Sequence, residues 1–91
     1  VIVTSVSSPY VHAYPWSASG FGTKFTDPAT LPTGTGDDVK FSIDGSEVMV
    51  THSSSPYITA YPWSSGGFGS KFSNPGTLPS GTGAGVDFVL I

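Results

Sequence analysis

A chain of 91 residues has room for one domain at most. Its three lysines, its lack of arginine and its net charge of −3 leave no basic patch for nucleic acid or for an anionic membrane surface. No apolar stretch approaches the length of a membrane span. The absence of cysteine excludes disulfides and thiolate metal ligands and leaves the cellular compartment undetermined. Frequent glycine, proline, serine, threonine and aromatic residues are typical of short strands joined by tight turns.

The chain consists of two tandem copies of one repeat, offset by 47 residues. Trp16 aligns with Trp63, for example, and 26 of the 44 aligned pairs are identical. We therefore divide a single domain into repeat 1 (residues 1–47) and repeat 2 (residues 48–91), and we call two residues at corresponding positions twins.

Each repeat predicts four short strands. Those of repeat 1 are expected at residues 1–4, 10–14, 21–25 and 39–43, and those of repeat 2 at residues 48–51, 57–61, 68–72 and 86–91. Asp44-Gly45 is a strong hairpin signal that returns the chain into the first strand of repeat 2. No segment shows helical periodicity over a useful length.

The lengths of the connections indicate the architecture. Three connections in each repeat are short enough for hairpins, and the link around Pro28 to Gly36 is about a dozen residues long. Returning across a four-stranded sheet takes roughly 14 Å, and a dozen extended residues reach about 40 Å. Apolar runs such as Val1-Ile2-Val3 predict strands buried on both faces. We expect an all-β fold of two four-stranded β-propeller blade equivalents; a single β-sandwich is the alternative, and it explains the long links less well.

Three segments carry a resemblance to a known family: Asp27 to Gly36, Val39 to Gly45 and His52 to Tyr61. At these residues the chain resembles WD40-like β-propeller repeats, and most closely a phage and bacterial type with a PATLPTGTG linker. The resemblance covers nearly the whole chain and implies a propeller that acts as a platform without catalytic residues. Two features depart from the family: only two repeats are present, and Pro-Trp stands twice where a basic pair is more usual.

Two blades cannot close a propeller, which needs about 4–8 of them. Copies of the chain related by cyclic symmetry would supply the others, as a dimer, trimer or tetramer. We expect a homotrimer with six blades, because four blades are tight and rare. The chain begins at the second strand of a blade and ends on a first strand, so we expect residues 86–91 to pair with residues 1–4 of a neighbouring copy. A truncated longer array of repeats is the alternative.

The titratable residues form no repeated set. His12 and His52 occupy different repeat positions, and the pair Asp37-Asp38 has no acidic twin. Asp44 is better explained by the turn that it starts. Because an enzyme needs converging acid, base or nucleophilic groups, we expect no catalytic residues, no metal site and no cofactor.

The repeated aromatic motif supplies the candidate site. Tyr14-Pro15-Trp16 and Tyr61-Pro62-Trp63 are expected to end a strand at a blade rim, because proline cannot donate a ladder hydrogen bond. Exposed tryptophans there suit stacking on sugar rings, which makes Tyr14, Trp16, Tyr61 and Trp63 candidate ligand-binding residues and glycans a candidate partner. Alternatively, both tryptophans pack between blades as core. The sequence thus predicts a non-enzymatic platform of unknown partner, with a carbohydrate-binding lectin as the second possibility.

Overall fold

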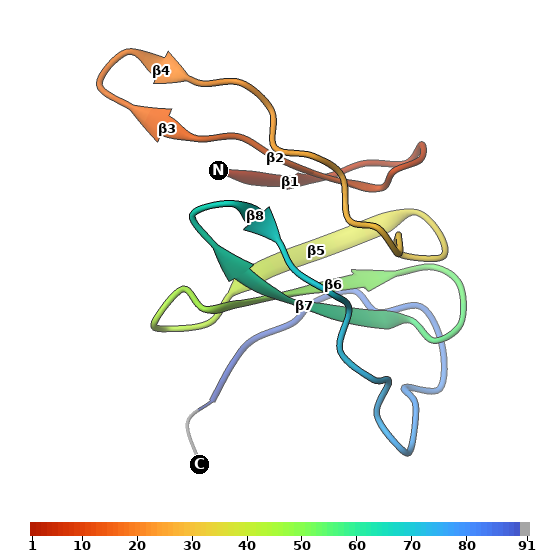
Figure 1. The fold of residues 1–91 in the computed structure, drawn as a ribbon. Coiled ribbons are helices and arrows are strands. Elements are labelled where there is room, and N and C mark those ends of the chain that lie inside the picture. The colour runs from red at the N-terminus through yellow and green to blue at the C-terminus, as the bar shows by residue number, and fades with distance from the viewer. Residues whose placement is uncertain (90–91) are drawn as a thin grey trace.

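The computed structural model describes residues 1–89 as an all-β structure, which confirms the predicted fold class at that level (Figure 1). Its strands are β1 (Ile2–Thr4), β2 (Val11–Ala13), β3 (Trp16–Ser17), β4 (Gly20–Phe21), β5 (Gly36–Phe41), β6 (Glu47–His52), β7 (Ile58–Ser64) and β8 (Gly67–Phe68). All strand pairs are antiparallel. These described residues contain no helix that is long and apolar enough to cross a membrane.

The largest sheet has four strands in the order β5-β6-β7-β8. It joins the two repeats, because β5 belongs to repeat 1 and pairs with β6, with Val39 opposite Val50. The turn between them is the predicted one: Gly45 has a φ of 74°, and Asp44 Oδ1 accepts hydrogen bonds from the hydroxyl and the amide of Ser46. These bonds lower the pKa of the Asp44 carboxyl, the Ser46 hydroxyl contributing most. The hairpin formed at this turn pairs β5 with β6 and completes the antiparallel four-stranded meander.

Repeat 1 forms two smaller sheets, β1-β2 and β3-β4. The β3–β4 hairpin projects away from the four-stranded sheet (Figure 1). The strand expected at residues 86–91 is not formed over 86–89, and residues 90–91 lie outside the described part. Residues 86–89 run beside β5 instead, with the amide of Val86 donating to Asp38 and Lys40 Nζ lying 3.2 Å from Asp87 Oδ1. Side-chain contacts of this kind cannot replace the ladder of backbone bonds that defines a strand.

The strand predicted at residues 57–61 is longer than expected: it includes Pro62 and Trp63 and ends at Ser64, just before the β7–β8 turn. Strand β7 runs through Pro62 and Trp63, and the amide of Trp63 donates to Ser46 on the β6 side at 2.8 Å. Because successive residues of a strand face opposite sides, the nitrogen of Pro62 faces the outer strand β8. It has no proton to donate, and β8 is shorter than the expected strand. The chain rejoins the sheet at Phe72, whose amide donates to Ala60 at 2.9 Å.

The two repeats pack through one face of each. The back face of repeat 1 consists of Ile2, Val11, Ala13 and Phe25, and the front face of repeat 2 of Val48, Val50, Tyr61, Trp63 and Phe68. Val11 shares a fully buried cluster with Val48, Val50 and Tyr61. Burying these apolar side chains stabilises the contact between the repeats, because it removes their surface from water.

The long link of each repeat crosses its own hairpin at the same place. A Cβ built on Gly36 would lie 2.6 Å from the carbonyl oxygen of Tyr10 and 2.8 Å from the Cβ of Thr4. A Cβ built on its twin Gly83 would lie 2.7 Å from the Cβ of Thr51, the twin of Thr4. Only glycine fits where the link passes this close to the hairpin. The link therefore crosses its hairpin along equivalent paths in the two repeats.

Candidate functional site

The aromatic residues of repeat 2 are packed between the repeats. Trp63 meets three rings edge to face, with centroids between 5.0 and 5.2 Å away: Phe25, Phe41 and Phe68. Tyr61 is fully buried, and burial raises the pKa of its phenol. Its hydroxyl donates to the carbonyl oxygen of Thr30 at 2.6 Å. Two of the four predicted site residues therefore take part in the core.

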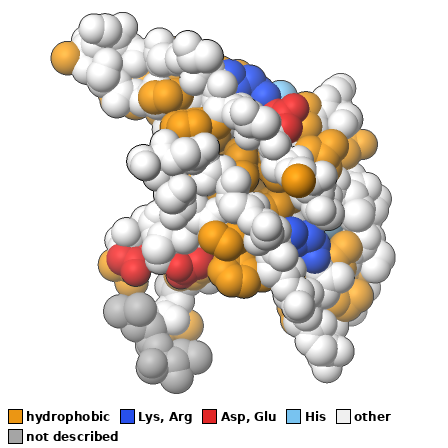
Figure 2. All heavy atoms as spheres, in the orientation of Figure 1, with side chains coloured by type: hydrophobic (Ala, Val, Ile, Leu, Met, Phe, Trp, Pro, Cys, Tyr) orange, Lys and Arg blue, Asp and Glu red, His pale blue; other side chains and the backbone are white. Residues whose placement is uncertain are grey.

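The aromatic residues of repeat 1 have different surroundings. Trp16 is 62% exposed and Phe21 is 67% exposed, and their rings meet edge to face with centroids 5.0 Å apart. Tyr14 meets the same phenylalanine at 5.7 Å. Figure 2 shows hydrophobic side chains at the surface of the projecting β3–β4 hairpin, which carries this group. Twin tryptophans thus lie in unlike environments.

The four candidate residues do not converge on one site. Tyr14 and Trp16 are joined through Phe21, and Tyr61 and Trp63 are joined through Phe68. Among residues 1–89 no ring contact connects one group with the other. Among the four candidate residues Trp16 is the exposed one, so a ligand that stacks on a candidate ring would meet the group of repeat 1.

A buried histidine links the sheet to the long link of repeat 1. His52 is fully buried; its Nε2 lies 2.8 Å from Thr59 Oγ1 and its Nδ1 lies 3.4 Å from Thr33 Oγ1. The Thr33 hydroxyl donates to the carbonyl of Ser55 at 2.7 Å, so its oxygen is free to accept from Nδ1–H. We assign the Thr59 hydroxyl as the donor to Nε2, which satisfies a neutral imidazole. Burial lowers the pKa of His52 accordingly.

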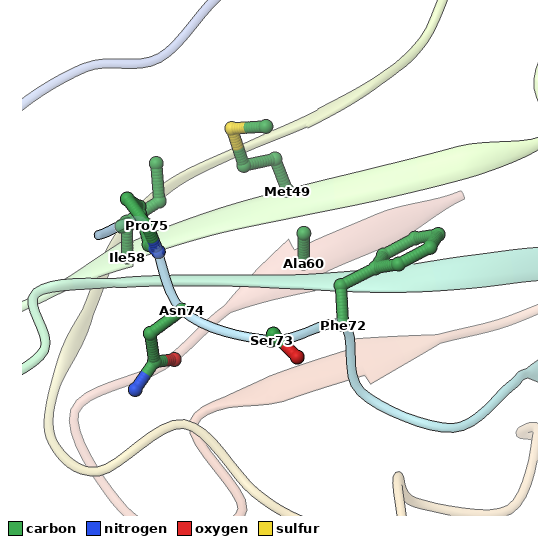
Figure 3. A pocket seen from close by; sticks show the side chains of 7 residues that line it. All are labelled: Met49, Ile58, Ala60, Phe72, Ser73, Asn74 and Pro75. Atoms are coloured by element: carbon green, nitrogen blue, oxygen red, sulfur yellow. The ribbon is translucent and has the colours of Figure 1, made fainter.

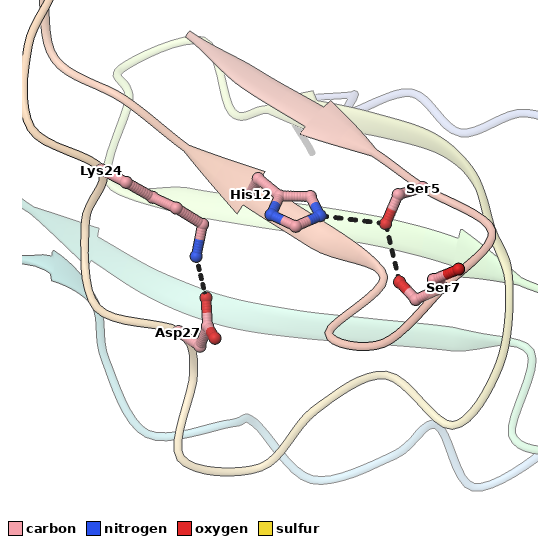
Figure 4. Close-up of polar contacts among 5 residues, drawn as sticks. All are labelled: Ser5, Ser7, His12, Lys24 and Asp27. Carbon is pink, nitrogen blue, oxygen red and sulfur yellow. Dashed lines mark hydrogen bonds and ion pairs between the residues drawn. The ribbon is translucent and has the colours of Figure 1, made fainter.

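The second histidine makes the mirrored contact in repeat 1 (Figure 4). Nε2 of His12 lies 3.0 Å from the hydroxyl of Ser5, which donates to the carbonyl of Ser7 at 2.8 Å. Ser5 is the twin of His52, and His12 is the twin of Thr59. Each repeat therefore places one imidazole and one hydroxyl at the same two positions, in opposite order. Aligning the two repeats shows that the two histidines are not twins. The alignment does not show that each histidine contacts a hydroxyl at the other's repeat position, because that requires knowing that the two positions lie side by side.

Charged groups lie at the edges of the structure. Lys24 Nζ donates to the carboxylate of Asp27 (Figure 4), and its twin Lys71 donates to the amide oxygen of Asn74 at 2.6 Å. Both contacts close the loop that follows the outer strand. Within residues 1–89 no three histidine or carboxylate side chains are placed to hold a metal ion.

A cavity of about 200 Å³ lies on the face of the four-stranded sheet that is turned away from repeat 1 (Figure 3). It is lined by Met49, Ile58, Ala60, Phe72, Ser73, Asn74 and Pro75. The twins of Ile58 and Ala60 are Val11 and Ala13, which are covered by repeat 2. The cavity therefore marks the surface of repeat 2 that corresponds to the covered surface of repeat 1.

Apart from the charged groups at its edges, the described surface presents aromatic, aliphatic and hydroxyl groups. Such groups bind by packing, stacking and neutral hydrogen bonds. No protein-family model, curated protein or solved structure matches this chain. Its function is therefore inferred from its own repeats and contacts.

Proposed function

We propose that this chain is a non-enzymatic structural and binding platform of the β-propeller type, as its WD40-like resemblance implies. Each complete four-stranded sheet is a blade. The observation that carries this proposal is the packing of one repeat on the next: the back face of repeat 1 covers the front face of the β5–β8 meander. Neighbouring propeller blades pack face to face in this way, and here the two-stranded β1–β2 sheet of repeat 1 packs on the one complete four-stranded sheet of residues 1–89.

The open edge of β1 supports ring closure between copies. Among residues 1–89, β1 pairs only with β2, whereas its twin β6 lies between β5 and β7. The amide of Ser5 donates to Tyr10, and the carbonyl of Val1 accepts from Tyr14. By alternation, the backbone groups of Ile2 and Thr4 face the open edge.

The segment that begins at Val86 is the partner we propose for this edge. It continues from Gly83 along the path that leads from Gly36 into β5, and β5 is the strand that occupies the corresponding edge of β6. Pairing this segment with β1 of the next copy completes a blade from two chains. Three copies then give the six blades that we favour.

Light scattering tests the ring directly, and about three times the chain mass of 9.4 kDa is expected. Amide hydrogen exchange tests the strand pairing. Protection of the Ile2 and Thr4 amides should rise with protein concentration, because pairing would shield them. The amide of Val3 faces β2 and is the internal control, since its protection should not depend on concentration. A monomer at micromolar concentration, or fast exchange at Ile2 and Thr4 in an assembled sample, would contradict the ring closed by strand pairing.

A carbohydrate-binding lectin is the second candidate, and the exposed pair of Trp16 and Phe21 favours it. Such rings can stack on the apolar face of a sugar. A glycan array of the wild type and of Trp16→Ala tests this function, with Ile43→Ala as a control at another exposed apolar residue. Binding that is lost only in Trp16→Ala supports the lectin, and an array without signal rejects it.

A further inference from the structure

The contact between the two repeats provides a template for a contact between two chains. It joins the back face of repeat 1 to the front face of repeat 2, as defined above. Each of these faces has a twin on the other repeat. The front face of repeat 1 consists of Val1, Val3, Tyr14, Trp16 and Phe21, and the back face of repeat 2 of Met49, Ile58, Ala60 and Phe72.

Both twin faces are uncovered. On the front face, Val1 and Val3 are 48% and 46% exposed, whereas their twins Val48 and Val50 are fully buried. On the back face, Phe72 is 46% exposed and borders the cavity of about 200 Å³. The chain thus carries the two halves of its own internal contact, one at each end. No side chain of either half is charged, so packing the two halves together buries no charged side chain.

The polar contacts of the template can be repeated as well. The Tyr61 hydroxyl donates to Thr30, and the twins of these residues, Tyr14 and Thr77, would bring the same groups together between two chains. The hydroxyl of Thr33 donates to the carbonyl of Ser55, and its twin Ser80 retains a hydroxyl.

The glycines of the long links show the same difference between covered and open surfaces. A Cβ built on Gly34 would lie 2.6 Å from Ser54 Oγ, because that link is pressed against repeat 2. A Cβ built on its twin Gly81 would meet nothing within 4 Å. At Gly81 the link of repeat 2 therefore has the small residue that close packing requires and, within residues 1–89, no atom near the position that a side chain would take.

From these four observations we infer that the front face of repeat 1 in one copy packs on the back face of repeat 2 in a second copy, head to tail. Trp16 of one copy meets Phe72 of the other, as Trp63 meets Phe25 within the chain at 5.0 Å. The Tyr14 hydroxyl donates to the carbonyl of Thr77. The inference rests on the proposed ring and names the side-chain contact that holds it. Because the interface is heterologous, the rotation between copies determines whether it closes.

Two variants that each destroy one face test this contact. Trp16→Glu introduces a charge into the front face of repeat 1, and Phe72→Glu introduces one into the back face of repeat 2. Ser65→Glu adds the same charge at the exposed β7–β8 turn and is the matched control. Circular dichroism verifies that each variant is folded, and Trp16→Ala and Phe72→Ala repeat the test with milder changes. Sedimentation equilibrium then gives the mass of each protein and of the equimolar mixture of the two glutamate variants.

The head-to-tail contact predicts a distinctive result. Each glutamate variant alone should have the mass of one chain, because every interface would contain one damaged face. Their mixture should have roughly twice the 9.4 kDa chain mass, because one undamaged face remains on each protein. The control should assemble as the wild type does.

Other results are equally informative. If the wild type assembles and either glutamate variant assembles equally well, or if the folded mixture stays at the mass of one chain, the inferred contact is wrong while the ring proposal stands. A wild type that has the mass of one chain at every concentration overturns both.

Discussion

The hydroxyl of Tyr61 donates a hydrogen bond of 2.6 Å to the carbonyl oxygen of Thr30, a residue 31 positions earlier in the chain. This hydrogen bond connects the long link of repeat 1 to the sheet of repeat 2. Tyr61→Phe should lower the free energy of unfolding by about 1–2 kcal/mol, because a partly buried carbonyl loses its donor. Urea denaturation measures the loss. Tyr14→Phe is the control and should leave the unfolding of the dissociated chain nearly unchanged; equal losses in both variants would contradict this role.

Trp63→Ala and Trp16→Ala should differ strongly despite the identity of their repeat positions. Trp63 lies among three phenylalanine rings, and its removal should cost about 3–5 kcal/mol of unfolding free energy. Trp16 is 62% exposed, so its removal should cost less than about 1 kcal/mol in the dissociated chain. Thermal or urea unfolding at low protein concentration compares the two, and similar losses would show that the repeats are packed alike.

Gly36→Ala should destabilise the chain by about 1–3 kcal/mol, because the new methyl group would press on the carbonyl of Tyr10. Gly76→Ala is the matched control. A Cβ at Gly76 would meet nothing within 4 Å, so this substitution should be close to neutral. Equilibrium unfolding of both variants tests the close approach, and a neutral Gly36→Ala would contradict it.

Acid should destabilise the chain through His52. Burial lowers the pKa of this histidine in the folded chain, whereas in the unfolded chain it titrates near 6.5. As the pH falls from 7 to 5, the unfolded state takes up a proton that the folded state resists, so the free energy of unfolding decreases. The loss should be absent above pH 7, where both states hold a neutral ring.

Exchanging the histidine for the residue of the other repeat isolates this effect. His52→Ser introduces the residue that stands at the twin position, Ser5, and should flatten the decrease between pH 7 and 5. His12→Thr makes the corresponding exchange in repeat 1 and should retain it. Unfolding curves at several pH values provide the comparison; a slope that is the same in the wild type and in His52→Ser would exclude His52 as its cause.

Much of the fold follows from local signals. The turn at Asp44-Gly45, the strands on either side of it and the all-β class are as the sequence predicts, because hairpin chemistry acts over a few residues. The strand that was expected to stop at Pro62 continues instead. A strand can pair with one neighbouring strand on each side, and proline prevents a ladder hydrogen bond only on the side that its nitrogen faces. Which side this is depends on how the strands are paired.

The candidate site was predictable only in part. Repetition alone marks Tyr14, Trp16, Tyr61 and Trp63, but identical motifs predict identical environments. Burial depends on what lies against each face, which is a property of neighbours distant in the sequence. Only the structure separates the exposed Trp16 from the packed Trp63.

The sequence by itself determined that this chain is a duplicated β-structure with short hairpins and one long link per repeat, because turn residues and the 47-residue offset are properties of the chain alone. The tertiary structure decided which copy of each face is covered. Two repeats in tandem make one contact between them and leave one face of each repeat without a partner in residues 1–89. The physical reason is that packing requires a second surface, and a chain of two repeats supplies it only once.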